Sequence, residues 1–252
     1  MRQFGIIGFP LGHSFSKKYF TEKFDRENIE AEYLNFPIGQ INSLTDILAA
    51  HPGLCGFNVT IPHKQHILPY LTELSEEARK IGAVNCVRIR YQDGKTILSG
   101  YNTDAYGFRK ALLNFLPERP EKALILGNGG AAKAVRFVLD SLGTEVLTVS
   151  RTPKNEKEIS YADIPHKTAS FKLIVNTTPL GTWPATEGYP DIPYHLLTPE
   201  HYLFDLVYNP EITEFMKRGM KNGAHVCNGL EMLTGQAEAG WAIWNESPSG
   251  HL

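Results

Sequence analysis

Cysteine is scarce in this sequence. The chain of 252 residues has only Cys55, Cys86 and Cys227, and they lie far apart. An odd and scattered set argues against a disulfide framework and favours buried thiols in a reducing compartment, so we expect a cytoplasmic protein. Apolar runs of transmembrane length are also absent, and the apolar stretch at the N-terminus is broken by glycine and proline. That stretch is expected to be a first β-strand rather than a signal peptide.

An excess of charge of one sign is lacking as well. The formal net charge is −2 at pH 7, and no basic run stands out locally. This gives no electrostatic basis for binding nucleic acid or an anionic membrane, so we expect neither as a partner. The composition, 42% hydrophobic and 21% charged, is that of an ordinary globular protein. The length allows one large domain or two modest ones, and it leaves open whether the protein is a monomer or a homodimer.

Strand-like and helix-like segments alternate along the chain, which predicts an α/β fold with parallel sheets in two units. A helix over 104–115 leads into the proline- and charge-rich LPERPEK, which we interpret as the joint between the units. Ser43 and Ser75 are expected to cap helices, and Asp93-Gly94 is expected to be the turn of a hairpin.

A glycine-rich turn, Gly127-Asn128-Gly129-Gly130-Ala131-Ala132, follows the apolar strand ALIL and opens a helix. Glycines let the backbone approach a pyrophosphate, whose charge is met by N–H groups at the helix start. Ala132 replaces the third glycine of the usual pattern and is small enough for close packing of the helix on the strand. The turn therefore predicts a dinucleotide-binding unit.

The end of the next strand distinguishes the two nicotinamide cofactors. A site for NAD usually ends this strand in an acid that binds the adenosine ribose, but EVLTV runs into Ser150-Arg151-Thr152, with Lys154 beyond and no acid before Glu156. An arginine with hydroxyls and a second cation suits a 2′-phosphate. NADP is therefore favoured over NAD.

The octapeptide FNVTIPHK, residues 57–64, alternates apolar and polar residues until Pro62 ends the strand. Its polar residues are either a solvent-facing sheet edge or part of a site. Reduction of a carbonyl by hydride creates an alkoxide that needs a proton, and Lys64 is a candidate donor.

Other polar clusters lie where elements meet. Asn85 lies where a helix passes into a strand, and Asn102-Thr103-Asp104 lies at the start of the joint helix, where Asp104 is alternatively an N-cap. Ser14 and Ser16 place hydroxyls at a helix start, as an anion site or as caps. We expect no metal site, since His63 and His66 have no third ligand nearby and are interpreted as surface residues.

Together these segments resemble shikimate dehydrogenases over nearly the whole chain. The matching motifs, in family order, are GFPLGHSFS, NVTIPHK, GAVN, NTD, GNGGAAKA, SRT, NTTPLG, DLVYNP and GLEMLTGQA. The resemblance implies a substrate domain over 1–103, completed by a returning C-terminal helix over 229–252, and a Rossmann-like NADP domain over 104–228. It also implies reduction of 3-dehydroshikimate to shikimate with NADPH in aromatic amino acid biosynthesis.

The resemblance assigns roles by motif position. Lys64 and Asp104 are the implied catalytic pair, with Lys64 as the proton donor. The implied substrate contacts are Ser14, Ser16, Thr60, Asn85, Asp104, Tyr208 and Gln236. The implied cofactor contacts are Gly127, Asn128, Gly129, Gly130, Ala131, Ser150, Arg151, Thr152, Lys154, Thr177 and Gly229. With the glycine turn in one unit and Lys64 in the other, we expect the reaction to occur in a cleft that closes over the substrate.

Two positions depart from the family pattern. Lys17 stands where proline is usual, which alters the start of a helix, and Ser150 stands where asparagine is usual, which weakens the preference for NADP.

One alternative is a quinate or dual quinate/shikimate dehydrogenase that uses NAD. An alternative from another class is a non-catalytic sensor of nucleotide and ligand.

Overall fold

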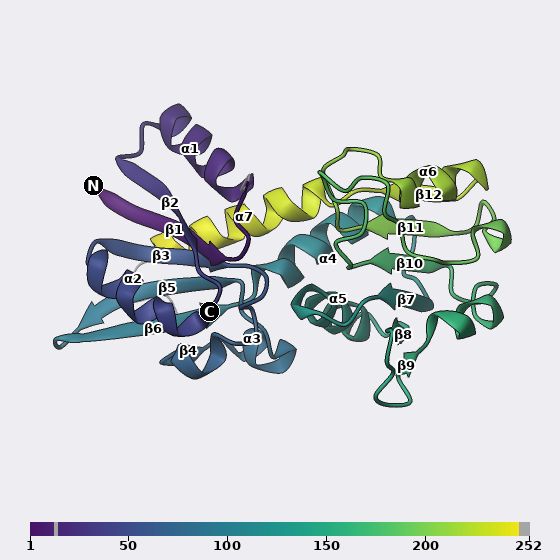
Figure 1. The fold of residues 1–252 in the computed structure, drawn as a ribbon, viewed down its shortest axis with the longest axis horizontal. Coiled ribbons are helices and arrows are strands. Elements are labelled where there is room, and N and C mark those ends of the chain that lie inside the picture. The colour runs from purple at the N-terminus through teal and green to yellow at the C-terminus, as the bar shows by residue number, and fades with distance from the viewer. Residues whose placement is uncertain (13–14, 247–252) are drawn as a thin grey trace. The chain divides into compact units, whose positions relative to one another are not determined.

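The computed structural model describes residues 1–12 and 15–246, and strands and helices alternate along most of them (Figure 1). Contacts divide the chain into two compact units. The first unit holds residues 1–103 and the chain from 237 onward, and the second holds residues 104–236. The division falls within helix α7 (Leu230–Asn245). The predicted α/β class is confirmed. None of the helices in the described residues has the length and apolarity that crossing a bilayer requires.

The first unit contains a six-stranded sheet in the order β2-β1-β3-β5-β6-β4. Its strands are β1 (Arg2–Gly8), β2 (Ala31–Pro37), β3 (Leu54–Val59), β4 (Glu73–Leu74), β5 (Cys86–Gln92) and β6 (Lys95–Tyr101). β1 pairs in parallel with β2 and β3, whereas β5 runs antiparallel to both β3 and β6. The expectation of a parallel sheet was therefore wrong for this unit, which has a mixed sheet.

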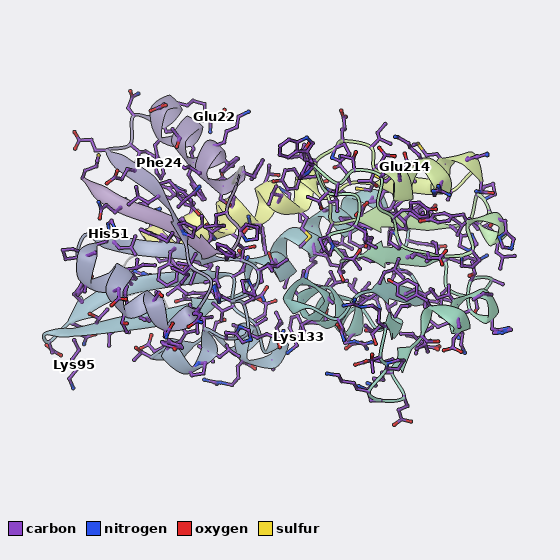
Figure 2. All side chains as sticks on the ribbon, viewed as in Figure 1. Glu22, Phe24, His51, Lys95, Lys133 and Glu214 are labelled. Carbon is purple, nitrogen blue, oxygen red and sulfur yellow. The ribbon has the colours of Figure 1, made fainter. Side chains whose placement is uncertain are left out.

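The hairpin turn accounts for one of these reversals. Asp93 and Gly94 have φ values of 50° and 73°, the left-handed conformation that a two-residue hairpin turn requires. The predicted hairpin is thus confirmed, and Lys95 lies beside its tip (Figure 2).

Helices cover both faces of the first sheet. α1 (Phe15–Glu27) and the later part of α7 pack on one face, in a cluster that includes Phe4, Phe20 and Trp244. On the opposite face, α2 (Leu44–Ala50), α3 (Glu76–Ile81) and the short helices η1 (Ile41–Ser43) and η2 (Leu68–Tyr70) pack around Ile7 and Phe57. Phe4 and Ile7 lie on opposite faces because successive side chains of a strand alternate. Phe24 is buried in the first cluster while Glu22 of the same helix is exposed (Figure 2).

The two predicted caps have different outcomes. The Ser75 hydroxyl accepts a hydrogen bond from the Ala78 amide at 3.1 Å, so this N-cap of α3 is confirmed. Ser43 makes no side-chain cap bond at the start of α2, so that prediction was wrong. The reason is that η1 precedes α2 directly and gives Ser43 a helical backbone, with φ −66° and ψ −6°. An N-cap side chain reaches the helix amides from an extended backbone.

The second unit contains a fully parallel sheet in the order β12-β11-β10-β7-β8-β9. Its strands are β7 (Lys122–Leu126), β8 (Glu145–Val149), β9 (Glu158–Ile159), β10 (Leu173–Asn176), β11 (Tyr202–Asp205) and β12 (His225–Cys227). Here the expectation of a parallel sheet is confirmed.

The order of the strands reverses at β7, which lies between β10 and β8. The strands that follow β7 in the chain, β8 and β9, lie on one side of it, and β10, β11 and β12 lie on its other side. Such a reversal of strand order is where open α/β sheets bind ligands.

Helices cover both faces of this sheet as well. α4 (Thr103–Phe115) and α5 (Gly130–Ser141) lie on one face, where the rings of Phe108 and Phe204 meet edge to face. α6 (Glu214–Lys221) lies on the other, where a Cβ on Gly219 would meet Leu203 at 2.6 Å. The short helices η3 (Tyr161–His166) and η4 (Tyr194–Leu196) contribute to the second of these faces. Because β7 pairs in parallel with both β8 and β10, the carboxyl ends of these three strands lie at the same edge of the sheet.

Candidate active site

The strand that precedes Lys64 lies in the middle of the first sheet. β3 pairs with β1 on one side and β5 on the other, so the alternative of a solvent-facing sheet edge was wrong. Asn58 on this strand is only 4% exposed. The alternation of core residues ends at Val59, because Ile61 lies beyond the strand and is 64% exposed.

A tight turn carries the chain from this strand to Lys64. The His63 amide donates to the Thr60 carbonyl at 2.8 Å, and the Thr60 amide donates to the Ile7 carbonyl at 2.9 Å. His63 is buried, with its Nε2 atom 2.7 Å from the Ile38 carbonyl, so its interpretation as a surface residue was wrong. Its ring fixes the turn, and no group of three potential metal ligands occurs in the described part of the chain.

Two backbone hydrogen bonds bring Lys64 and Asn85 together. The Val84 amide donates to the Lys64 carbonyl, and the Val59 amide donates to the Asn85 carbonyl, each at 2.8 Å. Lys64 is half-buried and Asn85 is buried. The turn after β3 and the segment before β5 are therefore neighbours, with Thr60, Lys64 and Asn85 at the same end of the first unit.

The Asn85 side chain reaches the start of α4. Its Oδ1 atom accepts a hydrogen bond from the Thr103 amide at 2.6 Å, and its Nδ2 atom donates to the Thr103 hydroxyl at 3.0 Å. Asp104 follows at the second position of α4, so it lies inside the first turn rather than at the N-cap. It is 6% exposed and belongs to the second unit. Its pairing with Lys64 stays a prediction.

Ser16 belongs to a buried polar network of the first unit. The Tyr33 hydroxyl donates to Asn58 Oδ1 at 2.6 Å, and the Asn58 Nδ2 atom donates to the Asn85 carbonyl at 3.2 Å. Burial raises the pKa of Tyr33 well above its ordinary value, and a hydrogen bond with Ser16 opposes the rise. The phenol therefore stays a neutral donor that links α1 to β3. Tyr33 was missed from the sequence, whereas Asn58 was among the polar residues of FNVTIPHK but received no role there. Ser14 lies outside the described residues.

The glycine turn of the second unit has the backbone that its sequence predicts. Gly127 has a φ of 101°, which only glycine adopts readily, and a Cβ there would lie 3.0 Å from Thr177 Oγ1. Gly129 is the N-cap residue of α5 and, as a glycine, offers no side-chain hydrogen bond to the helix amides. Nothing lies within 4 Å of the position that a Cβ would take there. The amides at the start of α5 therefore have no capping side chain and can donate hydrogen bonds to an anionic ligand. The pyrophosphate of a dinucleotide is such a ligand. Ala132 is buried, consistent with close packing of the helix.

Thr177 follows β10 beside this turn. Its amide and its hydroxyl both donate to the Leu126 carbonyl, at 3.0 and 2.7 Å. The carboxyl ends of β7 and β10 are joined in this way, at the edge where the order of the strands reverses. Thr177 and the glycine turn therefore form one part of the second unit.

The segment after β8 presents the predicted phosphate contacts. Arg151, Thr152 and Lys154 are exposed, whereas Ser150 is buried at 5%. The Ser150 hydroxyl donates to Glu158 Oε2 at 3.2 Å. This carboxylate was missed from the sequence, because it belongs to the neighbouring strand β9 and not to the end of β8 where such an acid is expected.

Further predicted residues follow β11, precede α7 or lie within α7. Burial raises the pKa of the Tyr208 phenol, which keeps it protonated at neutral pH. Gly229 lies directly against the Leu206 backbone, where a Cβ would overlap the carbonyl. Gln236 is 7% exposed, and its amide lies 2.9 Å from where a Cβ on Gly107 would stand. The crossing of α4 and α7 therefore fixes the backbone of Gln236 within the second unit.

A buried carboxylate supports this end of the second unit. Asp205 accepts hydrogen bonds from the Asn176 side chain at 2.9 Å, the Val207 amide at 3.0 Å and the Thr213 hydroxyl at 2.6 Å. It is fully buried, and burial raises its pKa to about 6. Asp205 therefore ties the ends of β10 and β11 to the start of α6.

Comparison with known proteins identifies relatives along the whole chain. Residues 6–87 match the family model described as the shikimate dehydrogenase substrate binding domain. Shikimate dehydrogenase (NADP(+)) of Clostridium beijerinckii is 39% identical, covering 98% of this chain and 93% of the relative.

Two solved structures have the same fold. Shikimate 5-dehydrogenase from Thermus thermophilus, in complex with NADP(H) and shikimate, aligns with a TM-score of 0.83 at 31% identity, over 97% of this chain and 94% of that one. Quinate dehydrogenase from Corynebacterium glutamicum, in complex with NAD, aligns with a TM-score of 0.84 at 27% identity, over 97% and 93%. The identity and the coverage of the curated relative, together with the matched substrate-domain model, show that the chain belongs to the shikimate dehydrogenase family.

Proposed function

We propose that this chain catalyses the reversible, NADP-dependent reduction of 3-dehydroshikimate to shikimate, a step of aromatic amino acid biosynthesis. The observation that carries the proposal is the joint placement of Thr60, Lys64 and Asn85 at one end of the first unit, in a chain of this family. Hydroxyl, ammonium and amide groups are the donors that a polyhydroxylated carboxylate substrate requires. Lys64 belongs to the first unit and the glycine turn to the second.

NADPH, when bound, supplies the hydride that reduces the substrate carbonyl. Lys64 donates a proton to the oxygen that becomes the new hydroxyl, and it takes that proton back in the oxidative direction. Asp104 keeps the ammonium charged and oriented and accepts a hydrogen bond from a substrate hydroxyl. Asn85 and Gln236 hold hydroxyls, and the remaining contacts hold the substrate carboxylate. Those remaining contacts are Ser14, Ser16, Thr60 and Tyr208.

The second unit would hold the cofactor. Gly127 through Ala131 and the start of α5 would accept the pyrophosphate. Thr177 follows β10 beside this turn, whereas Gly229 follows the edge strand β12 and lies against the Leu206 backbone. Arg151, with Ser150, Thr152 and Lys154, would bind the 2′-phosphate, because a guanidinium pairs with phosphate through two parallel hydrogen bonds.

Quinate is the principal alternative substrate, together with NAD as the cofactor. The similarity to a quinate dehydrogenase in complex with NAD keeps this alternative in view. The exposed Arg151 after β8 favours NADP, and the curated relative from Clostridium beijerinckii is named for NADP(+).

The non-catalytic sensor is disfavoured because this chain has both Lys64 and Asp104. All three cysteines, which lie in the described part of the chain, are outside disulfides, and this supports the proposed cytoplasmic location.

Steady-state kinetics of the purified protein test the proposal directly. Shikimate and quinate are each assayed against NADP and NAD, with the initial rate of reduced cofactor formation as the readout. We expect the highest kcat/KM with shikimate and NADP. A higher kcat/KM with quinate and NAD would replace the proposed reaction with the alternative, and no turnover of either substrate would favour a sensor.

A further inference from the structure

Glu158 lies beside the predicted phosphate contacts although it follows them in sequence. β9 pairs with β8 in parallel, with Thr148 opposite Glu158 and Val149 opposite Ile159. The Ser150 amide also donates to the Ile159 carbonyl at 3.0 Å. The strand pairing therefore returns the chain to the end of β8 and places a carboxylate there.

The Glu158 carboxylate accepts three hydrogen bonds from the segment 150–155. The Ser150 hydroxyl donates to Oε2 at 3.2 Å, and the Lys154 amide donates to the same oxygen at 3.1 Å. The Asn155 side-chain amide donates to Oε1 at 3.1 Å. These donors belong to the segment that would bind the 2′-phosphate, so Glu158 occupies groups that an anionic ligand would otherwise use.

A hydroxyl has one proton to donate. While the Ser150 hydroxyl donates to Glu158, it has no proton for a phosphate. The carboxylate also adds negative charge next to the place where a phosphate dianion would bind, and like charges repel. Both effects act on NADP, which carries the 2′-phosphate, and not on NAD.

We propose that Glu158 is a specificity-determining residue that lowers the preference of this enzyme for NADP over NAD, by competing with the 2′-phosphate for Ser150 and its neighbouring donors. This inference rests on the proposed function, since it assumes that the segment 150–154 reads the 2′-phosphate. Arg151 provides the attraction and Glu158 limits it. The preference for NADP over NAD is therefore smaller than Arg151 alone would give.

A purely structural role predicts the opposite sign. If Glu158 only held the segment 150–155 in the shape that binds phosphate, its neutralisation would weaken binding of the 2′-phosphate. Competition instead predicts tighter binding when the charge is removed. Whether neutralisation of Glu158 strengthens or weakens binding of the 2′-phosphate therefore distinguishes the two roles.

The test is calorimetric titration of the full chain with adenosine 2′,5′-bisphosphate and with adenosine 5′-monophosphate, which differ only in the 2′-phosphate. Glu158→Gln keeps an acceptor oxygen but removes the charge, and it should bind the bisphosphate about fivefold more tightly, the factor that corresponds to about 1 kcal/mol for a partly exposed charge pair. Binding of the monophosphate should stay unchanged. Glu156→Gln is the matched control, since Glu156 is exposed in the same loop and its change alters net charge equally; it should shift bisphosphate binding by less than about twofold.

A double variant identifies the donor that is released. Ser150→Ala should weaken bisphosphate binding more in the Glu158→Gln background than in the unaltered chain, where Glu158 competes for the hydroxyl proton. Weaker or unchanged bisphosphate binding in Glu158→Gln overturns the inference while leaving the proposed cofactor intact. Failure of the unaltered chain to prefer the bisphosphate over the monophosphate would overturn the NADP assignment itself.

Discussion

The Lys23 ammonium lies 3.0 Å from both carboxylate oxygens of Glu238, although 215 residues separate the two in sequence. Lys23 is 6% exposed and also contacts Glu27 at 3.1 Å, while the Tyr19 hydroxyl donates to Glu238. The contacts join α1 to α7 within the first unit. They hold the C-terminal helix against the helix whose first turn carries Ser16.

Removal of Glu238 should destabilise the first unit. Glu238→Ala leaves a buried ammonium with one carboxylate partner, and we expect a loss of about 2 kcal/mol in the free energy of unfolding. Urea denaturation followed by tryptophan fluorescence measures it, since Trp241 and Trp244 pack in the same cluster. Glu22→Ala is the control, because its partner Lys18 has a side chain that is 78% exposed, and it should cost under about 0.5 kcal/mol. Equal losses in the two variants would contradict a role for the buried contact.

Replacement of Lys64 should abolish most of the turnover. Lys64→Ala should lower kcat by about two to four orders of magnitude with a much smaller change in KM, because the proton donor is lost while most binding contacts remain. The measurement is steady-state kinetics with shikimate and NADP. Lys80→Ala, which removes an exposed lysine of the same unit, should leave kcat unchanged. Near-normal turnover in Lys64→Ala would rule out its catalytic role.

Arg151 should control the choice of cofactor. Arg151→Ala should raise the KM for NADP by about tenfold to a hundredfold, since hydrogen bonds to a charged group contribute roughly 1.5–3 kcal/mol each. Kinetics with NAD should stay nearly constant. Lys221→Ala removes an exposed cation of the same unit and serves as the control. Equal losses with both cofactors would show that Arg151 supports the fold instead.

Asp205 should give the protein a pH-dependent stability. Its folded pKa of about 6 lies above the value of about 3.9 in an unfolded chain, so between these values the folded state holds a proton that the unfolded state has lost. The contribution of Asp205 to stability is therefore complete below about pH 4 and is lost as pH rises through about 6.

Asp205→Asn removes this titration and should retain hydrogen bonds to Asn176, Val207 and Thr213. The free energy of unfolding of the unaltered chain should fall by about 1 kcal/mol more than that of the variant between pH 5 and pH 7.5. Urea denaturation at both pH values measures the difference. Parallel pH profiles for the two proteins would show that Asp205 titrates in its ordinary range.

Gly107 should be required for the contact between α4 and α7. A Cβ at this position would overlap the Met232 carbonyl and approach the Gln236 amide to 2.9 Å, and backbone atoms of two helices yield little. Gly107→Ala should therefore lower the free energy of unfolding by about 1–3 kcal/mol and raise the KM for shikimate through displacement of Gln236. Gly39→Ala is the control, because nothing lies within 4 Å of its Cβ position. A stable Gly107→Ala variant with a normal KM would contradict this account.

The local sequence determined the features that depend on a few neighbouring residues. The Asp93-Gly94 turn, the Ser75 cap and the glycine turn at Gly127 all formed as predicted. Each of these features depends on backbone angles or on hydrogen bonds between residues at most a few positions apart. The residue types within the segment therefore determine its conformation. The family, too, followed from short motifs in their order along the chain.

Only the tertiary structure decided which distant segments became neighbours. The mixed first sheet, the central position of β3 and the burial of His63 depend on strand pairings that a local pattern leaves open. Ser43 failed as a cap because the preceding turn was already helical. Glu158 reaches Ser150 because β9 pairs beside β8, and the sequence placed that acid several residues too late to be recognised. Register between strands is set by the packing of whole faces, so these contacts had no signal within the segments themselves.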